Sequence, residues 1–274
     1  MPVAQAVAST AKAFAGNRVA SRIALTVGRE GGRSRCARIY EDGALRVRFP
    51  NDDHLQAIVV NTAGGIAGGD RIAFEIAVEE GAALTLTTAA AEKAYRSLGD
   101  DAALDVTLRV APGGMLNWLP QETILFNEAR LKRSIDAELA GDARLLLAEA
   151  VVFGRTAMGE TVQAGRLFDR WRVRRDGRLI FADTLRLDDM IAAQLAHRAV
   201  AAGGCAIATI LASPASEDDL AVVRAQTFAG EVGISSWNGA TLARLVARDG
   251  AALRHDLKLI VTSLAGALPR IWSN

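Results

Sequence analysis

A strand–turn–strand unit recurs three times in the middle of this sequence and constrains its fold more than any other feature. The turns follow Val78, Val110 and Leu139, so successive units are offset by 32 and 29 residues. In each unit an alternating strand leads through a short glycine-containing turn into a second, more apolar strand. An all-strand repeat of about 30 residues indicates stacked β layers, as in a solenoid or a β-helix. A plain antiparallel sandwich also has strands and turns but requires no fixed period, and it remains the alternative.

Apolar residues occupy nearly every second position before each turn, over residues 72–78, 104–110 and 131–139. A period of two is typical of half-buried strands and does not fit helices. The pattern continues on either side of Asp176-Gly177, a dipeptide that strongly favours a hairpin.

The character of the sequence changes after residue 189. Residues 190–202 are alanine-rich and fit a helix or a loop. Ser216 is a candidate N-cap for a helix reaching about residue 228, and residues 249–264 form a second amphipathic pattern. The fold is therefore expected to be mainly β, with a layered β-helix-like or solenoid body and two α-helices in the C-terminal third.

The domain organisation expected from these patterns is simple. Residues 1–20 are an alanine-rich tail without the charge and apolar core of a secretion signal. Residues 21–274 form a single domain, with the β-layered body over 21–189 and an α+β part over 190–274.

Composition excludes several classes of function. Half of the 274 residues are hydrophobic and the net charge is +1, so charge gives no reason to expect nucleic acid or a membrane as a partner. Cys36 and Cys205 are far apart and fit two reduced thiols in a cytoplasmic protein. No apolar run has the roughly 18 residues that a membrane span needs.

Residues 61–70 concentrate four glycines, Gly64, Gly65, Gly68 and Gly69, followed by Asp70. A phosphate-binding P-loop or a dinucleotide fingerprint would open a helix, but a strand pattern follows this stretch. We therefore interpret it as a close-packed corner that places Asp70. An enzyme that holds a small phosphorylated ligand at this corner is a third, less favoured reading.

Acidic residues recur near the ends of the repeated strands, as Glu92, Glu122 and Glu149, and Asp183 interrupts a later apolar strand. An acid in an apolar strand is costly unless it is paired or hydrated. Stacked layers would bring such acids together along a wet path that binds a divalent cation weakly. Separate, salt-bridged or solvated acids are the alternative. The sequence has none of the cysteine or histidine spacings of a preformed zinc-type site.

Five ordered blocks resemble the signature of the UreD (UreH) family of urease accessory proteins. They are residues 64–70, 92–97, 117–122, 153–155 with 159–160, and 268–272. The resemblance covers residues 20–274. It departs from the family at Asn61-Thr62-Ala63, where members often carry a histidine or proline, and at Ala94, which replaces one member of an aromatic pair.

The resemblance implies a non-enzymatic role in nickel insertion, with a β-helix-like fold and two helices. Family members contact the urease apoprotein and recruit UreF, which docks the GTPase UreG carrying nickel. The path-lining acids of the family correspond to Asp70, Glu149 and Asp183, with Glu92 and Glu122 as further candidates. Nickel(II) would be bound only transiently, and no tightly bound cofactor is expected. A purely structural scaffold with no metal path is the alternative.

Partner surfaces are harder to place from sequence. Aromatic residues near the C-terminus, Trp237 and Trp272, are candidates for contacting UreF together with residues 249–264. Apolar residues in such positions also serve as ordinary core, so both interpretations stay open.

Overall fold

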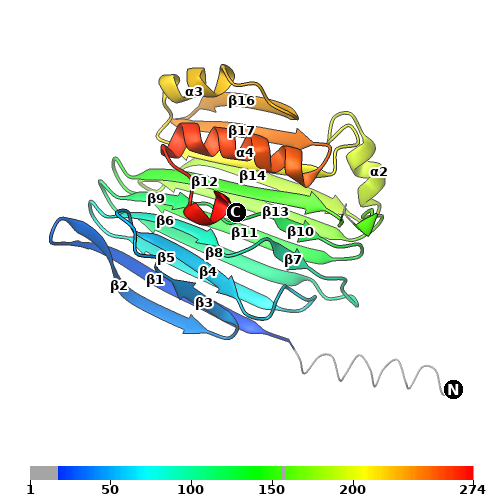
Figure 1. Ribbon diagram of the computed structural model, residues 1–274, viewed down its shortest axis with the longest axis horizontal. Helices are drawn as coiled ribbons and strands as arrows, with labels where there is room; N and C mark the ends of the chain where they lie inside the picture. The colour runs from blue at the N-terminus through cyan, green and yellow to red at the C-terminus, as the bar shows by residue number, and fades with distance from the viewer. Residues whose placement is uncertain (1–17, 156–157, 274) are drawn as a thin grey trace.

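Two large β-sheets form the body of the computed structural model, which describes residues 18–155 and 158–273 (Figure 1). The tail predicted over residues 1–20 falls almost wholly outside them. The first sheet has seven strands in the spatial order β14 (Arg178–Asp188), β13 (Arg166–Arg175), β11 (Arg130–Leu139), β8 (Ala102–Val110), β5 (Arg71–Val78), β1 (Ala20–Glu30) and β2 (Arg33–Asp42).

The second sheet has ten strands. Its main path runs β16 (Glu231–Trp237), β17 (Ala240–Ala247), β15 (Ala206–Ser213), β12 (Arg144–Phe153), β9 (Met115–Trp118), β6 (Ala83–Thr88), β4 (Gln56–Asn61) and β3 (Leu45–Arg48). Two short strands, β10 (Thr123–Leu125) and β7 (Glu92–Ala94), pair beside β12.

The chain winds alternately through the two sheets, so that β5, β8, β11 and β13 stack in parallel in one and β6, β9 and β12 in the other. Val78, Val110 and Leu139 lie side by side in register. Since these residues begin the three predicted turns, the repeat of 32 and 29 residues is the register of the stacked coils. The β-helix-like prediction is confirmed, with about four coils, and the sandwich alternative is wrong.

A narrow third side closes the coils where β7 and β10 lie. Ile66, Ala94, Leu125 and Phe153 form a parallel row across four successive passes of the chain, and all four side chains are buried. Four of the five blocks that carry the family resemblance contribute to this side or adjoin it. The coil register therefore brings segments that are far apart in sequence next to one another on this side.

The core lies between the two sheets and follows directly from the alternating pattern. Inward residues such as Ile76, Leu108 and Ile135 are fully buried. Each such side chain contributes roughly 1.5–3 kcal/mol by leaving water. Phe74 and Trp118 meet edge to face across the interior, with ring centroids 5.4 Å apart.

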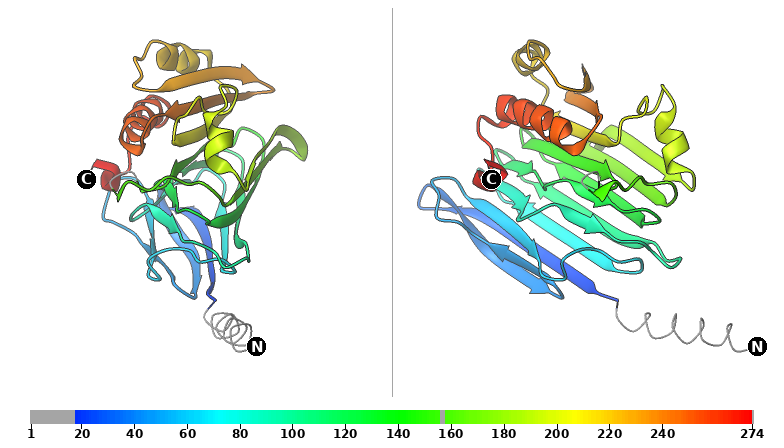
Figure 2. Two further views of the ribbon diagram at one scale, coloured as in Figure 1. Left: turned by 90° about the vertical axis from the view of Figure 1, so that its right-hand side faces the viewer. Right: turned by 45° about the vertical axis from the view of Figure 1, so that its right-hand side comes forward.

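The helices lie at the C-terminal end of the coils, as predicted (Figure 2). α3 (Glu217–Arg224) is capped by Ser216, whose hydroxyl accepts from the Asp219 amide at 3.2 Å. The helix ends before the expected residue 228. α4 (Gly250–Ala265) packs on β17, β15 and β12. The alanine-rich stretch adds a short third helix, α2 (Ile191–Ala196), and the 3-10 turn η2 (Arg270–Ser273) follows α4.

The hairpin predicted at Asp176-Gly177 forms, and a second hairpin closes at Asn238-Gly239. Asp176-Gly177 and Asn238-Gly239 each have positive φ at both residues, 51° and 74° in the first and 49° and 74° in the second. Such turns match the twist of the strands they join. Among the described residues, no helix combines the length and the apolar character that a bilayer span requires.

Candidate functional site

A buried cluster of three charged side chains interrupts the apolar interior. The side chain of Arg133 lies between the carboxylates of Glu149 and Asp169, and the three residues are 2%, 5% and 8% exposed. The Arg133 guanidinium donates through Nη1 to Glu149, and through Nη2 and Nε to Asp169, with Nε–Oδ1 at 3.1 Å. One arginine therefore bridges two acids inside the coil.

The strand register creates this arrangement. Arg133 on β11 and Asp169 on β13 are direct neighbours in the parallel pairing, and both occupy inward-facing positions of their strands. Glu149 comes from β12 in the opposite sheet. The arginine consequently links the two sheets across the interior.

Two tryptophans complete the hydrogen bonding of the acids. The indole Nε1 of Trp118 donates to Glu149 Oε1 at 2.8 Å, and that of Trp171 donates to Asp169 Oδ1 at 3.0 Å. Buried charges persist only when they are paired and their remaining hydrogen-bonding capacity is met. The cluster satisfies both conditions.

Burial and charge act in opposite directions on this cluster. Burial raises the pKa of Glu149, although the Arg133 charge and the Trp118 hydrogen bond partly offset that effect. Burial alone would lower the pKa of Arg133, but the charges of Asp169 and Glu149 outweigh it and raise that pKa further. The guanidinium thus stays protonated in the core.

A cavity of about 210 Å³ ends on one side of the cluster. Its lining includes exposed residues, Gly64 and Lys93, and also the buried Arg133 and Glu149, so it leads from the surface into the coil. Apolar side chains, among them Phe74, form most of the wall in between.

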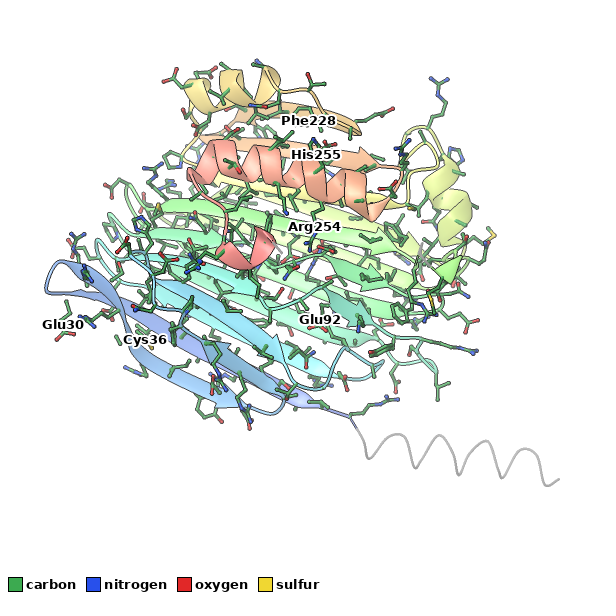
Figure 3. The ribbon with its side chains drawn as sticks, in the orientation of Figure 1. Glu30, Cys36, Glu92, Phe228, Arg254 and His255 are labelled. Carbon is green, nitrogen blue, oxygen red and sulfur yellow. The ribbon has the colours of Figure 1, made fainter. Side chains whose placement is uncertain are left out.

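Glu92 stands in the wall of this cavity, on β7 at the narrow side (Figure 3). The amide Nδ2 of Asn61 donates to both of its carboxylate oxygens, at 3.2 and 3.1 Å. Burial raises the pKa of Glu92, with these hydrogen bonds acting in the opposite direction. The cavity therefore carries one carboxylate near the surface and another at its inner end.

A second cavity, of about 110 Å³, lies on the other side of the cluster. Asp169 and Trp171 line it, as do Asp183 and Arg244. Asp183 pairs with Arg244 at 2.7 Å and is about a quarter exposed. The two cavities thus reach opposite partners of Arg133, the first at Glu149 and the second at Asp169.

The structure separates the predicted path residues into two groups. Glu92, Glu149 and Asp183 line the two cavities, whereas Asp70 and Glu122 are not among the lining residues described for them. The carboxylate of Asp70 accepts from the backbone amides of Val19 and Ala67, both at 2.8 Å, and so holds the corner together.

Glu122 is held by the C-terminal helix. Its carboxylate pairs with Arg254 of α4 at 3.0 Å, and Arg254 also donates to Gln121. This contact ties α4 to the segment between β9 and β10.

The glycine corner packs tightly on residues 92–97. A Cβ at Gly65 would overlap the ring of Tyr95, and one at Gly68 would overlap the hydroxyl of Ser97. The Tyr95 hydroxyl donates to the Gly64 carbonyl at 2.8 Å. The glycines therefore allow two of the signature blocks to meet.

The two candidate partner tryptophans differ in exposure. Trp237 on β16 is 43% exposed, while Trp272 is 3% exposed and donates from Nε1 to Thr87 Oγ1 at 2.9 Å. In the isolated chain, only the ring of Trp237 is presented to solvent.

Arg133 and Asp169 were not among the residues singled out from the sequence. The signal was present, because both stand at positions that the alternating pattern assigns to the interior. Arg133 lies between Leu131 and Ile135, and Asp169 lies between Leu167 and Trp171. A charge at an inward position of an otherwise apolar face marks a buried ion pair or a site.

Comparison with known proteins decides the family. The model of the family described as UreD urease accessory protein matches residues 19–273. The chain belongs to the UreD family. A urease accessory protein UreD of Rhodopseudomonas palustris strain HaA2 is 53% identical over 98% of each chain. Another, of Bradyrhizobium diazoefficiens, is 50% identical over 97% of this chain and 98% of its own.

Membership of the UreD family gives the chain an accessory role in urease maturation. Among the described residues, no three His, Cys, Asp or Glu side chains are grouped to hold a metal ion. What the described interior offers a cation is therefore a few separate carboxylates along the cavities.

Proposed function

We propose that this protein is a cytoplasmic, non-enzymatic scaffold in urease maturation that passes nickel(II) through its interior. The observation that carries the proposal is the placement of Glu92, Glu149 and Asp183 along two cavities that meet at one buried cluster. The cation is cargo, so the carboxylates need to bind it only in passing.

The donor set fits that task. Carboxylate oxygens bind divalent cations, but nickel is held more firmly by imidazole and thiolate ligands. One or two carboxylates at each step, with apolar walls between them, favour short residence. Glu92 would receive the ion from the exposed end, Glu149 would hold it at the inner end, and Asp183 would take it beyond the cluster.

The partners follow from the family. We infer that UreF, with the GTPase UreG docked on it, supplies nickel at one end of the path and that the urease apoprotein receives it at the other. Trp237 on the exposed face of β16 supports a role for the C-terminal part in partner contact, while the burial of Trp272 gives it a packing role in the free chain.

A second candidate function is a scaffold through which no metal passes. It is favoured because each candidate acid already has a partner. Asp70 accepts from backbone amides and Glu92 from Asn61, and the acids Glu122, Glu149 and Asp183 pair with Arg254, Arg133 and Arg244 respectively. In that case the acids stabilise the fold and nothing more.

Activation of urease by acid-to-amide variants separates the two functions. Glu149→Gln combined with Asp183→Asn should lower nickel-dependent urease activity in cells while UreF still co-purifies with the variant. Glu80→Gln combined with Asp53→Asn removes two exposed acids and is the matched control. Unchanged urease activity in the path variant, at equal protein level, would exclude the conduit.

A further inference from the structure

We propose that Arg133 is the gate of the interior path, its guanidinium occupying the position between Glu149 and Asp169 that a cation must cross. This inference rests on the proposed conduit function and adds a gating residue to it. Arg133 lies outside every block that carries the family resemblance.

The geometry is that of a plug between two spaces. Arg133 and Glu149 line the larger cavity, and Asp169, bound by the same guanidinium, lines the smaller one. A cation moving from one cavity to the other therefore meets the arginine between the two carboxylates.

Electrostatics makes the plug effective. A divalent cation beside a buried guanidinium is repelled at low effective dielectric, where little water screens the charges. The two acids are already neutralised in part by the arginine and are unavailable as ligands. With the arginine in place, an ion entering from the surface stops in the larger cavity.

The Arg133 side chain also has space in which it can change its conformation. The bonds to Glu149 and Asp169 hold the guanidinium in place, but the long Arg133 side chain also lines a cavity of about 210 Å³. Movement of the guanidinium into that cavity frees Glu149 and Asp169 together. Glu149 and Asp169 then carry up to two negative charges between them, which matches a divalent cation. Trp118 and Trp171 can keep donating to Glu149 Oε1 and Asp169 Oδ1.

Removal of the guanidinium should turn the plug into a cation site. In tag-free, full-length protein, Arg133→Met is expected to bind one more Ni²⁺ per chain than wild type in equilibrium dialysis, and Ni²⁺ should raise its melting temperature. The matched control is the variant Arg133→Met/Glu149→Gln/Asp169→Asn, which has a similar cavity without the charges. It should bind Ni²⁺ at least about tenfold more weakly than Arg133→Met.

Two outcomes overturn the proposal. One is that Arg133→Met binds no more Ni²⁺ than the triple variant does. The other is that wild type, with the guanidinium in place, already binds Ni²⁺ in a way that Glu149→Gln/Asp169→Asn abolishes.

A second comparison covers the case in which Arg133→Met does not fold. In Arg133→Met/Glu149→Gln only Asp169 stays charged, so this variant has one unpaired buried charge where Arg133→Met has two. A rise of its melting temperature with Ni²⁺ that is absent from the triple variant supports the gate, and equal behaviour of the two overturns it.

These measurements use the isolated chain and are independent of urease. If the Ni²⁺-binding tests contradict the gate but urease activation still depends on Glu149 and Asp183, Arg133 is not part of the path and the conduit remains supported. Ni²⁺ binding by Arg133→Met without any effect of the acids on activation would remove the conduit instead.

Discussion

Arg133 and Asp169 lie opposite each other on the parallel strands β11 and β13, and the guanidinium donates twice to the carboxylate in the interior of the coil. The next pair along the same two strands, Asp136 with Arg170 at 2.6 Å, points outward and is about two-fifths exposed. One pair of strands thus offers a buried and an exposed ion pair for comparison.

Breaking the buried pair should cost far more stability than breaking the exposed one. Asp169→Asn removes one of the two carboxylate charges that face the buried Arg133 guanidinium. We expect a loss of about 3–5 kcal/mol in the free energy of unfolding. Asp136→Asn should cost about 0–1 kcal/mol. Urea denaturation of the two variants checks this, and equal losses would contradict the assignment of the cluster as a buried, paired site.

Glu92→Gln should stabilise the protein at neutral pH and not in acid. Burial raises the pKa of Glu92 in the folded chain above its ordinary value of 4.5. At a pH between the pKa of Glu92 in the unfolded chain and its higher pKa in the folded chain, the folded state keeps a proton that the unfolded chain releases. The free energy of unfolding therefore falls as pH rises through that interval. The amide removes this loss, and the melting temperature of the variant should exceed that of wild type at about pH 7.5.

Near pH 4, below the ordinary pKa of a glutamate, Glu92 is mostly protonated in both the folded and the unfolded chain. The higher melting temperature of Glu92→Gln should therefore vanish there. Glu80→Gln, at an exposed position, is the control and should show no such difference. A constant effect of Glu92→Gln at all pH values would mean that packing, and not ionisation, is responsible.

Gly68→Ala should destabilise the corner, because the added Cβ would overlap the Ser97 side chain. We expect a loss of about 1–3 kcal/mol, as for other overpacked sites. Gly233→Ala on β16 is the matched control, since neither glycine has a positive φ and open space surrounds the added carbon at Gly233. Thermal unfolding measures both, and an unaffected Gly68→Ala would show that the corner tolerates a wider backbone separation.

The two C-terminal tryptophans should separate binding from folding. Trp237→Ala is expected to weaken UreF binding with little change in melting temperature, because its ring is 43% exposed. Trp272→Phe removes the hydrogen bond to Thr87 and should cost about 1 kcal/mol of stability. Titration calorimetry with UreF and thermal unfolding test both, and full UreF affinity in Trp237→Ala would remove that residue from the interface.

The layered fold was predictable because the spacing of the sequence repeat equals the strand register of the coils. The offsets of Val78, Val110 and Leu139 are the spacing of the coils. Ser216 caps α3 as expected, and α4 begins one residue after the predicted start at residue 249, with Asp249 as its cap. Local chemistry decides turns and caps, so the sequence reports them reliably.

The site was predictable only in part. Glu149 stood out as one of the acids near the ends of the repeated strands, but its partner Arg133 comes from the facing sheet and Asp169 from the next coil. Such contacts depend on how the sheets are placed against each other, which no local pattern encodes. Asp70 illustrates the reverse case, because the family resemblance implied that it lines a path, whereas its carboxylate accepts from backbone amides of the corner.

The most direct measurement of the central claim is nickel transfer in the presence of a competing chelator. Purified wild-type protein, assembled with UreF, nickel-loaded UreG and urease apoprotein, should activate urease even when a chelator in solution captures any released Ni²⁺. The Glu149→Gln/Asp183→Asn variant should assemble equally and activate urease far less under the same conditions. Equal, chelator-resistant activation by the variant would contradict a carboxylate-lined path through the interior.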